Sequence, residues 1–270
     1  MILLAILCCC LFFLSLYIFC LGGRPEHKDL HKLRGWKYAH RGLHNEQRPE
    51  NSMAAFRAAL DRGYGIELDI HLMKDGNLAV IHDSSLQRVA GADVNIEELT
   101  LEDLGKYPLG SSQEHIPLFS QVLELYRGKA PLIVELKCVN GNYADLCKAA
   151  LELLDQYEGL FCMESFDPRV TRWLRKNRPD IIRGQLSENW MRSAVKLPAI
   201  LKFVMTYHIS NLYTRPDFIA YKYADRKAFG TDLCRKFWGI QGVSWTLKSR
   251  EEYDTAVKEG WIPIFEGFEP

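Results

Sequence analysis

With 270 residues and 34 basic side chains balanced by 34 acidic ones, the chain has no net charge with which to attract nucleic acid or coat an anionic membrane. Its 47% apolar content is that of a globular protein, and no segment has the biased composition of a disordered or fibrous one. No nucleic-acid-binding motif and no glycine-rich nucleotide-binding motif is present, so neither partner is expected. The length favours one large domain. Because the net charge is zero, any charged ligand must be recognised by a local group of side chains.

The first 21 residues form an apolar segment without a charged side chain, long enough to cross a bilayer as a helix. A secretory signal peptide is the alternative, but no basic residue precedes the apolar run and no obvious small-x-small cleavage site follows it. We therefore expect residues 1–22 to be a single-pass transmembrane anchor, followed by a polar linker over residues 23–34. Because the nearest basic residues lie after the segment, the positive-inside tendency favours a cytoplasmic location for the rest of the chain.

Beyond the linker, eight extended apolar runs alternate with helical patterns. This order is typical of parallel strands that are each followed by a helix, and eight such units over residues 35–270 predict an α/β fold, the (β/α)8 TIM barrel. The expected strands are residues 36–40, 65–72, 132–137, 160–166, 182–186, 218–221, 243–247 and 262–265. The expected helices include residues 52–62, 118–126, 143–156, 168–177 and 250–259.

One segment, residues 78–116, departs from this alternation. It contains a short strand at residues 78–82 and a helix-like pattern at residues 95–106, followed by a connection rich in glycine and serine. We expect a small insertion, about residues 84–116, on one loop of the barrel. Because the loops at the carboxyl ends of the strands form the active site in this fold, the insertion could shape the substrate entrance. In the alternative, the insertion is an inert surface excursion, that is, a surface loop without a role in the active site.

Acidic residues lie within two of the expected strands. Glu67 and Asp69 are two residues apart, so a strand points both carboxylates to the same side. Burying adjacent carboxylates is costly, and a divalent cation with hard oxygen ligands removes that cost. Glu135 shares a strand face with Lys137 and is the third expected metal ligand. In the alternative, Glu135 only pairs with Lys137, or the acids point to solvent.

Two histidines end expected strands, His40 in the first strand and His82 in the short strand that precedes the insertion. Both therefore belong at the same rim of the barrel, where they make a plausible general acid and base. Arg41 is a forked, permanently charged donor suited to a phosphate oxygen, and Lys137 is a second cation. Together these groups indicate phosphoryl-transfer chemistry.

The segments that carry these residues, AHRGLHNEQRPENSMAAFRAAL and GIELDIHLMKDGNLAVIHD, closely resemble the glycerophosphodiester phosphodiesterase family. Further similar segments are IPLFSQVLEL, SFDPRVTRWLRKNRP and SWTL, so the resemblance extends over almost the whole chain beyond the linker. It implies a TIM barrel with the activity of a phosphoric diester hydrolase.

The resemblance also implies a role for each candidate residue. The histidines of the family's HRG and HD motifs form the catalytic acid/base pair, here His40 and His82, and we favour His40 as the acid and His82 as the base. The HRG arginine and the strand lysine, here Arg41 and Lys137, match groups that contact the phosphate. The positions that bind a divalent metal in the family, usually Ca²⁺ or Mg²⁺, are here Glu67, Asp69 and Glu135.

The chain departs from the family pattern at two places. The family's P-E-N-T motif is PENS here, and Ser52 in the last place can still cap the following helix. The tail differs more, because IFEGFEP replaces the usual G-I-I-T-D-x-P. The sequence therefore assigns no role to the residue at the last position of the barrel rim.

These observations predict metal-dependent hydrolysis of glycerophosphodiesters to glycerol 3-phosphate and an alcohol, in phospholipid metabolism, with a glycerol hydroxyl as a candidate nucleophile. One alternative keeps the site but takes a lysophospholipid or another lipid phosphodiester as substrate, which a membrane anchor favours. An alternative of another class is a noncatalytic phospholipid-binding scaffold. The head group, the choice between the two metals and the oligomeric state are left open.

Overall fold

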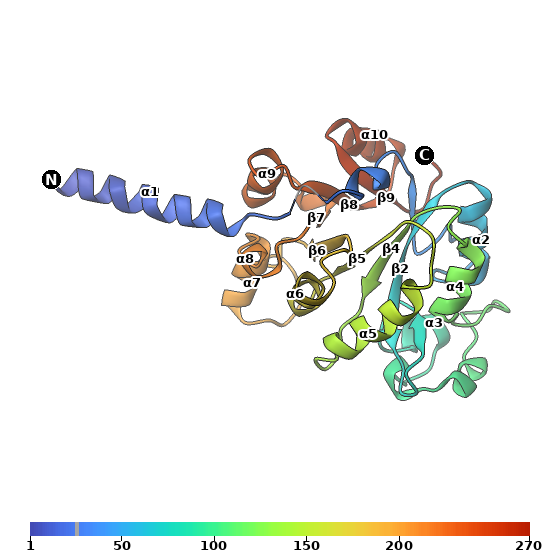
Figure 1. Cartoon of the computed structure of the whole chain (residues 1–270). Coiled ribbons are helices and arrows are strands. Elements are labelled where there is room, and N and C mark those ends of the chain that lie inside the picture. The colour runs from blue at the N-terminus through green and yellow to red at the C-terminus, as the bar shows by residue number, and fades with distance from the viewer. Residues whose placement is uncertain (25–26) are drawn as a thin grey trace.

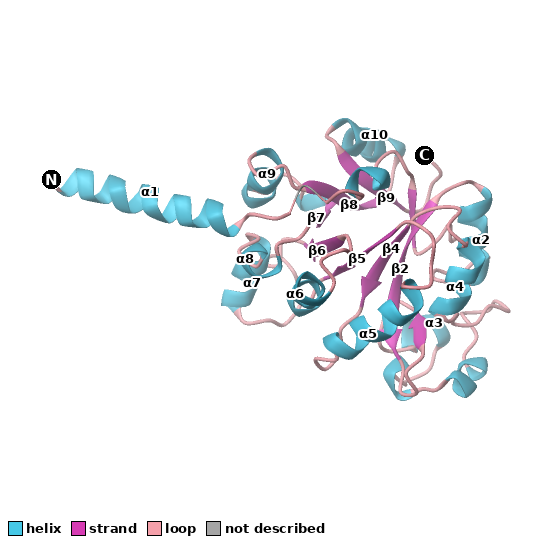
Figure 2. Cartoon of the chain, viewed as in Figure 1, coloured by secondary structure: helices cyan, strands magenta, loops and turns pink. Residues whose placement is uncertain are grey.

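The computed structural model describes residues 1–24 and 27–270, and residues 25–26, within the expected linker, lie outside the described residues. Eight parallel strands form a closed barrel surrounded by helices (Figure 1, Figure 2). The TIM barrel predicted from the sequence is therefore confirmed, and each expected strand overlaps one of the eight. The strands are β1 (Tyr38–His40), β2 (Gly65–Leu72), β4 (Leu132–Leu136), β5 (Phe161–Ser165), β6 (Arg183–Ser187), β7 (Phe218–Lys222), β8 (Gln241–Leu247) and β9 (Trp261–Phe265).

Strand pairing brings acidic residues together. Neighbouring barrel strands follow the chain order, and the barrel closes because β1 pairs with both β9 and β2. The register places Asp69 beside Glu135, and Glu135 beside Glu164. Residues in register on neighbouring parallel strands point to the same side of the sheet, so these carboxyl groups share the barrel interior.

Helices form the outer layer, and several begin at a capping residue. Ser52 accepts a hydrogen bond from the backbone N–H of Ala55, and Ser249 accepts one from that of Glu252. Asp167 caps a helix whose first residue is proline. Such a cap stabilises a helix by about 1 kcal/mol. The helices are α2 (Met53–Asp61), α4 (Phe119–Tyr126), α5 (Tyr143–Leu154), α6 (Pro168–Asn177), α7 (Ala199–Thr206), α8 (Asn211–Thr214), α9 (Phe229–Lys236) and α10 (Arg250–Lys258).

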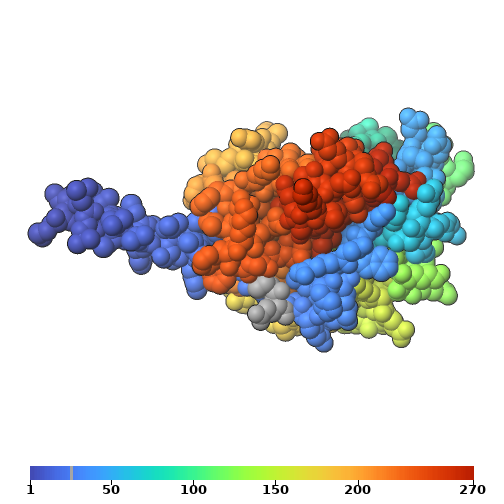
Figure 3. Space-filling model, turned by 90° about the horizontal axis from the view of Figure 1, so that it is seen from above, coloured from blue at the N-terminus to red at the C-terminus, as the bar shows by residue number. Residues whose placement is uncertain are grey.

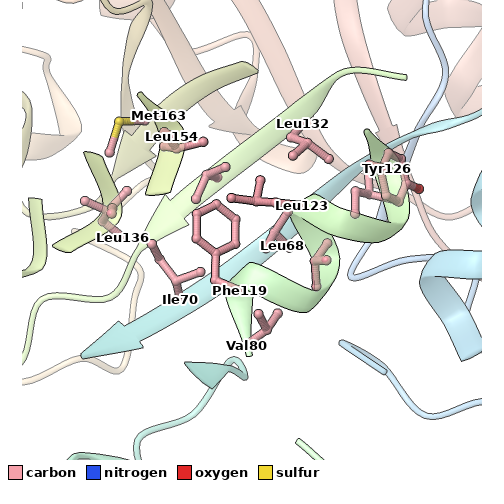
Figure 4. Close-up of a cluster of buried hydrophobic side chains, with 14 of the residues drawn as sticks. Leu68, Ile70, Val80, Phe119, Leu123, Tyr126, Leu132, Leu136, Leu154 and Met163 are labelled. Atoms are coloured by element: carbon pink, nitrogen blue, oxygen red, sulfur yellow. The ribbon is translucent and has the colours of Figure 1, made fainter. Parts of the chain in front are cut away.

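A large hydrophobic core lies between the barrel and its helices. Leu68 and Ile70 of β2 are fully buried and pack in one cluster with Phe119 of α4 (Figure 4). Burying each such side chain contributes roughly 1.5–3 kcal/mol. Because side chains alternate along a strand, the packing of Leu68 and Ile70 against the helices turns Glu67 and Asp69 toward the barrel interior.

The segment that follows β2 differs in part from the sequence expectation. Its elements are β3 (Leu78–Val80), α3 (Gln87–Ala90) and the 3-10 helices η2 (Ile96–Glu98) and η3 (Leu101–Lys106). The single helix expected over residues 95–106 is wrong, because the backbone is extended at Leu99, with φ −95° and ψ 158°. Thr100 and Asp103 then form a capping box that begins a second short helix.

Helix α1 (Ile2–Cys20) projects from the barrel (Figure 1, Figure 3). Among the described residues it is the one helix long and apolar enough to cross a membrane, a property that signal sequences share. After it, the short 3-10 helix η1 (Leu30–Leu33) packs on the barrel, with Leu30 and Leu33 buried in a cluster that includes Phe218 of β7.

Candidate active site

A cavity of about 300 Å³ lies at the carboxyl ends of the barrel strands. Asp69 lies next to it in the barrel interior, and Lys137 lines an adjoining cavity of about 680 Å³. The structure thus brings together all seven residues selected from the sequence. The five of them that line the smaller cavity are His40, Arg41, Glu67, His82 and Glu135.

Three carboxylates meet in the barrel interior. Glu67, Asp69 and Glu135 are buried, and one oxygen of each lies within 4.8 Å of the others. Burial, followed by the neighbouring negative charges, raises the pKa of Glu67 well above its usual value. Burial likewise raises the pKa of Glu135 to about 7. Burial would also raise the pKa of Asp69, but the cationic groups around Asp69 outweigh it and lower that pKa.

Lys137 is the cation in closest contact with these carboxylates. Its Nζ lies 2.7 Å from an oxygen of Glu135 and 3.0 Å from an oxygen of Asp69. Burial would lower the pKa of Lys137, but the two carboxylates raise it. Lys137 therefore stays charged beside the acidic cluster.

Arg41 is the second cation, and it occupies a constrained turn. Its φ of 53° lies in the left-handed region, which few residues other than glycine adopt. Two backbone hydrogen bonds of 2.9 Å hold this turn, one from the Arg41 N–H to the carbonyl of Glu67 and one from the Asn51 N–H to the carbonyl of Arg41. The guanidinium donates to Glu50 at 2.9 Å, and its Nε lies 3.4 Å from Asp69.

His40 lies at the end of β1 with a carboxylate on each side. Its Nδ1 lies 2.7 Å from Oε2 of Glu266, the residue that follows β9, and its Nε2 lies 3.8 Å from Oε2 of Glu67. Burial lowers the pKa of His40, and the hydrogen bond with His40 lowers the pKa of Glu266 to about 2. When the Nδ1–H of His40 donates to ionised Glu266, Nε2 is left on the side of the acidic cluster, where it can hold or accept a proton.

His82 is held by the segment after β3. Its Nδ1 lies 2.6 Å from Oδ1 of Asp83, and burial lowers its pKa. Arg88 of α3 donates to Asp83 at 2.5 Å and to both oxygens of Glu50 at 2.7 and 2.9 Å. Glu50 also accepts from Arg41, so ion pairs connect His82 to Arg41 through α3. This contact favours a role for the insertion in shaping the site over an inert excursion.

Two acidic residues of the cavity, Glu266 and Glu164, were not selected from the sequence. Glu266 falls in the tail that departs from the family pattern. Its position directly after the last strand was the one sequence feature that could have indicated a place at the barrel rim. Glu164 is buried in β5, and its Oε2 has no hydrogen-bond partner among the described residues. Burial, followed by the charge of Glu135, raises the pKa of Glu164 well above its usual value. The sequence feature that could have identified Glu164 is its position within a strand, on the side that faces the barrel interior.

The donor set fits a divalent cation. Carboxylate oxygens are the hard ligands that Ca²⁺ and Mg²⁺ prefer, and three of them lie close enough to share one ion. The raised pKa values of Glu67 and Glu135 express the cost of burying these acids together, which a cation removes. Glu164 adds a further acidic group to the same cavity.

Comparisons with known proteins agree with this geometry. The model of the glycerophosphoryl diester phosphodiesterase family matches residues 40–265. A glycerophosphodiester phosphodiesterase of Caldanaerobacter subterraneus subsp. tengcongensis is 28% identical over 237 residues, which are 82% of this chain and 89% of that protein. The lysophospholipase D GDPD1 of Mus musculus is 34% identical over 133 residues, 44% of this chain and 41% of that protein.

The fold is also found among solved structures. An Oleispira antarctica phosphodiesterase in complex with the product sn-glycerol-3-phosphate superposes with a TM-score of 0.72 at 21% identity. The match covers 87% of this chain and 94% of that structure.

Proposed function

Because the chain belongs to the glycerophosphoryl diester phosphodiesterase family and is a phosphoric diester hydrolase, we propose that it hydrolyses glycerophosphodiesters to glycerol 3-phosphate and an alcohol in phospholipid metabolism. We further propose that activity depends on a divalent cation, Ca²⁺ or Mg²⁺, held by Glu67, Asp69 and Glu135. The observation that carries the proposal is that three buried carboxylates, two histidines and two cations lie together in or beside the cavity of about 300 Å³.

Charge on the phosphate is neutralised by several groups at once. A bound divalent cation supplies positive charge next to the phosphoryl oxygens. Arg41 and Lys137, which lie against the same carboxylates, donate to the remaining phosphoryl oxygens. Because Asn51 holds the Arg41 turn and Glu50 accepts from the guanidinium of Arg41, that guanidinium is oriented before the substrate binds.

The two histidines transfer protons. His82 accepts the proton of the glycerol 2-hydroxyl as that oxygen attacks phosphorus, and His40 donates a proton to the departing alcohol. Water then opens the resulting cyclic phosphate while the histidines exchange roles. Asp83 and Glu266 accept the Nδ1–H of each ring and so direct Nε2 toward the reacting atoms. In this division His40 enters as the imidazolium, a form that burial disfavours and the negative charge of Glu266 stabilises.

We propose residues 1–22 as a single-pass membrane anchor and residues 35–270 as the catalytic domain, on the cytoplasmic side. The support is the uncharged, exposed α1 and the basic residues that follow it. A lysophospholipid is a second candidate substrate for the same site, and the cavity of about 680 Å³ beside it favours this class.

The test is release of glycerol 3-phosphate from glycerophosphocholine by the full chain in detergent, before and after chelation and re-addition of Mg²⁺ or Ca²⁺. We expect turnover only with a divalent cation, and a loss of at least about 100-fold in His40→Ala. Glu251→Gln, which neutralises an exposed carboxylate of α10, is the control and should keep full activity.

Two results would contradict the proposal in different ways. Equal turnover after complete chelation would contradict metal dependence alone. A folded chain that binds the cation but turns over neither glycerophosphocholine nor a lysophospholipid would instead be a noncatalytic phospholipid-binding scaffold.

A further inference from the structure

A second group of possible metal ligands lies beside the proposed catalytic acid. His44 follows His40 in the loop after β1, and Glu266 directly follows β9. One ligand atom of each of these three side chains lies within 4.8 Å of the others. This group is distinct from the acidic cluster in the barrel interior, because two of its three ligands are imidazole nitrogens.

The turn after β1 brings His44 back to the barrel rim. Arg41 and Gly42 both have a positive φ, 53° and 81°, so the chain turns sharply as β1 ends. A side chain at Gly42 would meet the backbone of Ala55 in α2 at 2.9 Å, and the N–H of Leu43 donates to the carbonyl of Ala55 at 3.0 Å. The turn is therefore fixed against α2, and His44 is positioned before any ion binds.

The ring of His44 has an unused nitrogen on the side of Glu266. Its Nε2 lies 4.0 Å from Oε1 of Glu266, which is too far for a hydrogen bond. This nitrogen is buried and has no hydrogen-bond partner among the described residues. A buried polar atom without a partner is costly, and an ion between the two side chains removes that cost. Burial lowers the pKa of His44 and so favours the neutral ring, which is the form that binds metals.

The donor set fits a transition metal better than Ca²⁺ or Mg²⁺. Two imidazole nitrogens and one carboxylate are a ligand set of catalytic zinc sites, whereas Ca²⁺ and Mg²⁺ prefer oxygen ligands. The side chains of His40, His44 and Glu266 are 14%, 20% and 23% exposed, so water can complete the coordination of the ion. A site with three protein ligands and an open position is typical of zinc that exchanges with solvent.

Two cations lie near the same carboxylate. Nζ of Lys248 lies 3.3 Å from Oε1 of Glu266, but the Lys248 side chain is 67% exposed and is free to turn to solvent when an ion binds. The guanidinium of Arg41 donates to Glu50 at 2.9 Å, and its Nε lies 3.4 Å from Asp69. Other carboxylates therefore balance the charge of Arg41, and the repulsion that a divalent ion meets at Glu266 is small.

We propose that His40, His44 and Glu266 bind a zinc ion that inhibits the enzyme. Zn²⁺ takes the place of the Nδ1 proton of His40, and this proton passes to solvent. The bound ring has only its Nε2–H left to give, and giving it leaves an imidazolate. The ring is therefore a far weaker acid than the imidazolium that protonates the departing alcohol. The inhibition rests on the proposed phosphodiesterase function, whereas the binding of zinc does not.

The test measures hydrolysis of glycerophosphocholine by the full chain in detergent, with the activating Mg²⁺ or Ca²⁺ at saturation, while free Zn²⁺ is raised. We expect complete inhibition that more Mg²⁺ or Ca²⁺ does not relieve and that a zinc chelator reverses. His44→Gln should raise the inhibition constant for Zn²⁺ by at least about tenfold and keep the zinc-free kcat/KM. His115→Gln removes an exposed histidine of the insertion and should keep the wild-type inhibition constant.

Zinc binding is also measured apart from activity. Calorimetric titration of Asp69→Asn, in which the acidic cluster has lost a ligand, should still show one zinc site, and adding His44→Gln should weaken it by at least about tenfold. X-ray absorption at the zinc edge should show two imidazole rings around the ion bound to the wild-type chain. The X-ray measurement needs no substitution, so it decides the site even where His44→Gln does not fold.

An inhibition constant that His44→Gln leaves unchanged would overturn the inference, as would a zinc shell of oxygens alone, and both would leave the phosphodiesterase proposal standing. Zinc bound by two histidines without loss of turnover would overturn the inhibitory role. If no diester is turned over with any metal, the proposed function fails, and calorimetry and X-ray absorption alone decide whether the zinc site exists.

Discussion

Nδ1 of His40 lies 2.7 Å from Oε2 of Glu266, which connects the end of the first barrel strand to the end of the last. The two strands are neighbours in the closed barrel, so residues more than 200 positions apart in the chain become hydrogen-bonded partners. The pair commits Nδ1 of His40 to Glu266 and leaves Nε2 for the reaction.

Glu266→Gln should lower kcat by about 10- to 100-fold with little change in KM, since the amide cannot stabilise the imidazolium but the phosphate-binding groups are untouched. Steady-state kinetics on glycerophosphocholine measure the effect. Glu269→Gln neutralises a carboxylate three residues later that pairs with Arg62 at the surface, and it should keep the wild-type kcat. An equal loss in both variants would show that the tail acts through folding and not through His40.

Glu266 should also give the fold a specific dependence on pH. Its pKa is lowered to about 2 by the hydrogen bond with His40, so its ionised form is favoured in the folded chain. A carboxylate with a lowered pKa stabilises the fold above its unfolded pKa, and this stability is lost as the pH falls toward the folded pKa. The difference in the free energy of unfolding between wild type and Glu266→Gln should be on the order of 1–3 kcal/mol above pH ~5 and should shrink toward pH ~2. Urea unfolding in detergent at several pH values measures it, and a constant difference would contradict the assignment.

Arg88 should matter for catalysis although it does not line the cavity. Arg88→Met removes the cation that holds Asp83 and Glu50, so both His82 and Arg41 lose support. We expect kcat/KM to fall by about tenfold, roughly 1.4 kcal/mol of transition-state stabilisation. Arg57→Met removes an exposed arginine of α2 and should have no effect. Wild-type kinetics in Arg88→Met would restore the view of the insertion as an inert excursion.

The N-terminal helix should keep the chain in the membrane. After expression, we expect the protein to stay in the membrane fraction through an alkaline carbonate wash and to keep its first residues, as intact mass will show. Protease added to right-side-out cells should leave the barrel intact, because the cytoplasmic orientation protects it. Release of a shortened protein lacking about 20 residues would identify a signal peptide instead.

The sequence predicted the barrel and the main site because their signals are local. Eight apolar runs separated by helical patterns specify the strands, and the spacing of Glu67 and Asp69 alone directs both carboxylates to one side. The contact of Glu135 with Lys137 was also within reach, because both lie on one short segment. These features need no knowledge of how distant segments pack.

Most of the remaining features depend on contacts between distant segments. Glu266 reaches His40 only because the barrel closes, and Arg88 reaches Glu50 only because α3 packs over the rim. The error over residues 95–106 has a local cause, since the periodicity of apolar residues does not reveal that Thr100 caps a new helix with Asp103. The cavity of about 680 Å³ beside the catalytic cavity unites residues from several strands and loops, so no single stretch of sequence specifies it.

The measurement that bears most directly on a metal-dependent phosphodiesterase is a calorimetric titration of the metal-free chain with Mg²⁺ and Ca²⁺, run beside glycerol 3-phosphate release at the same metal concentrations. We expect one site whose occupancy and turnover rise together, and we expect Asp69→Asn to lose both while Glu251→Gln keeps both. Full turnover in Asp69→Asn, or turnover of the metal-free wild type, would contradict the assignment of Glu67, Asp69 and Glu135 as the metal ligands on which the reaction depends.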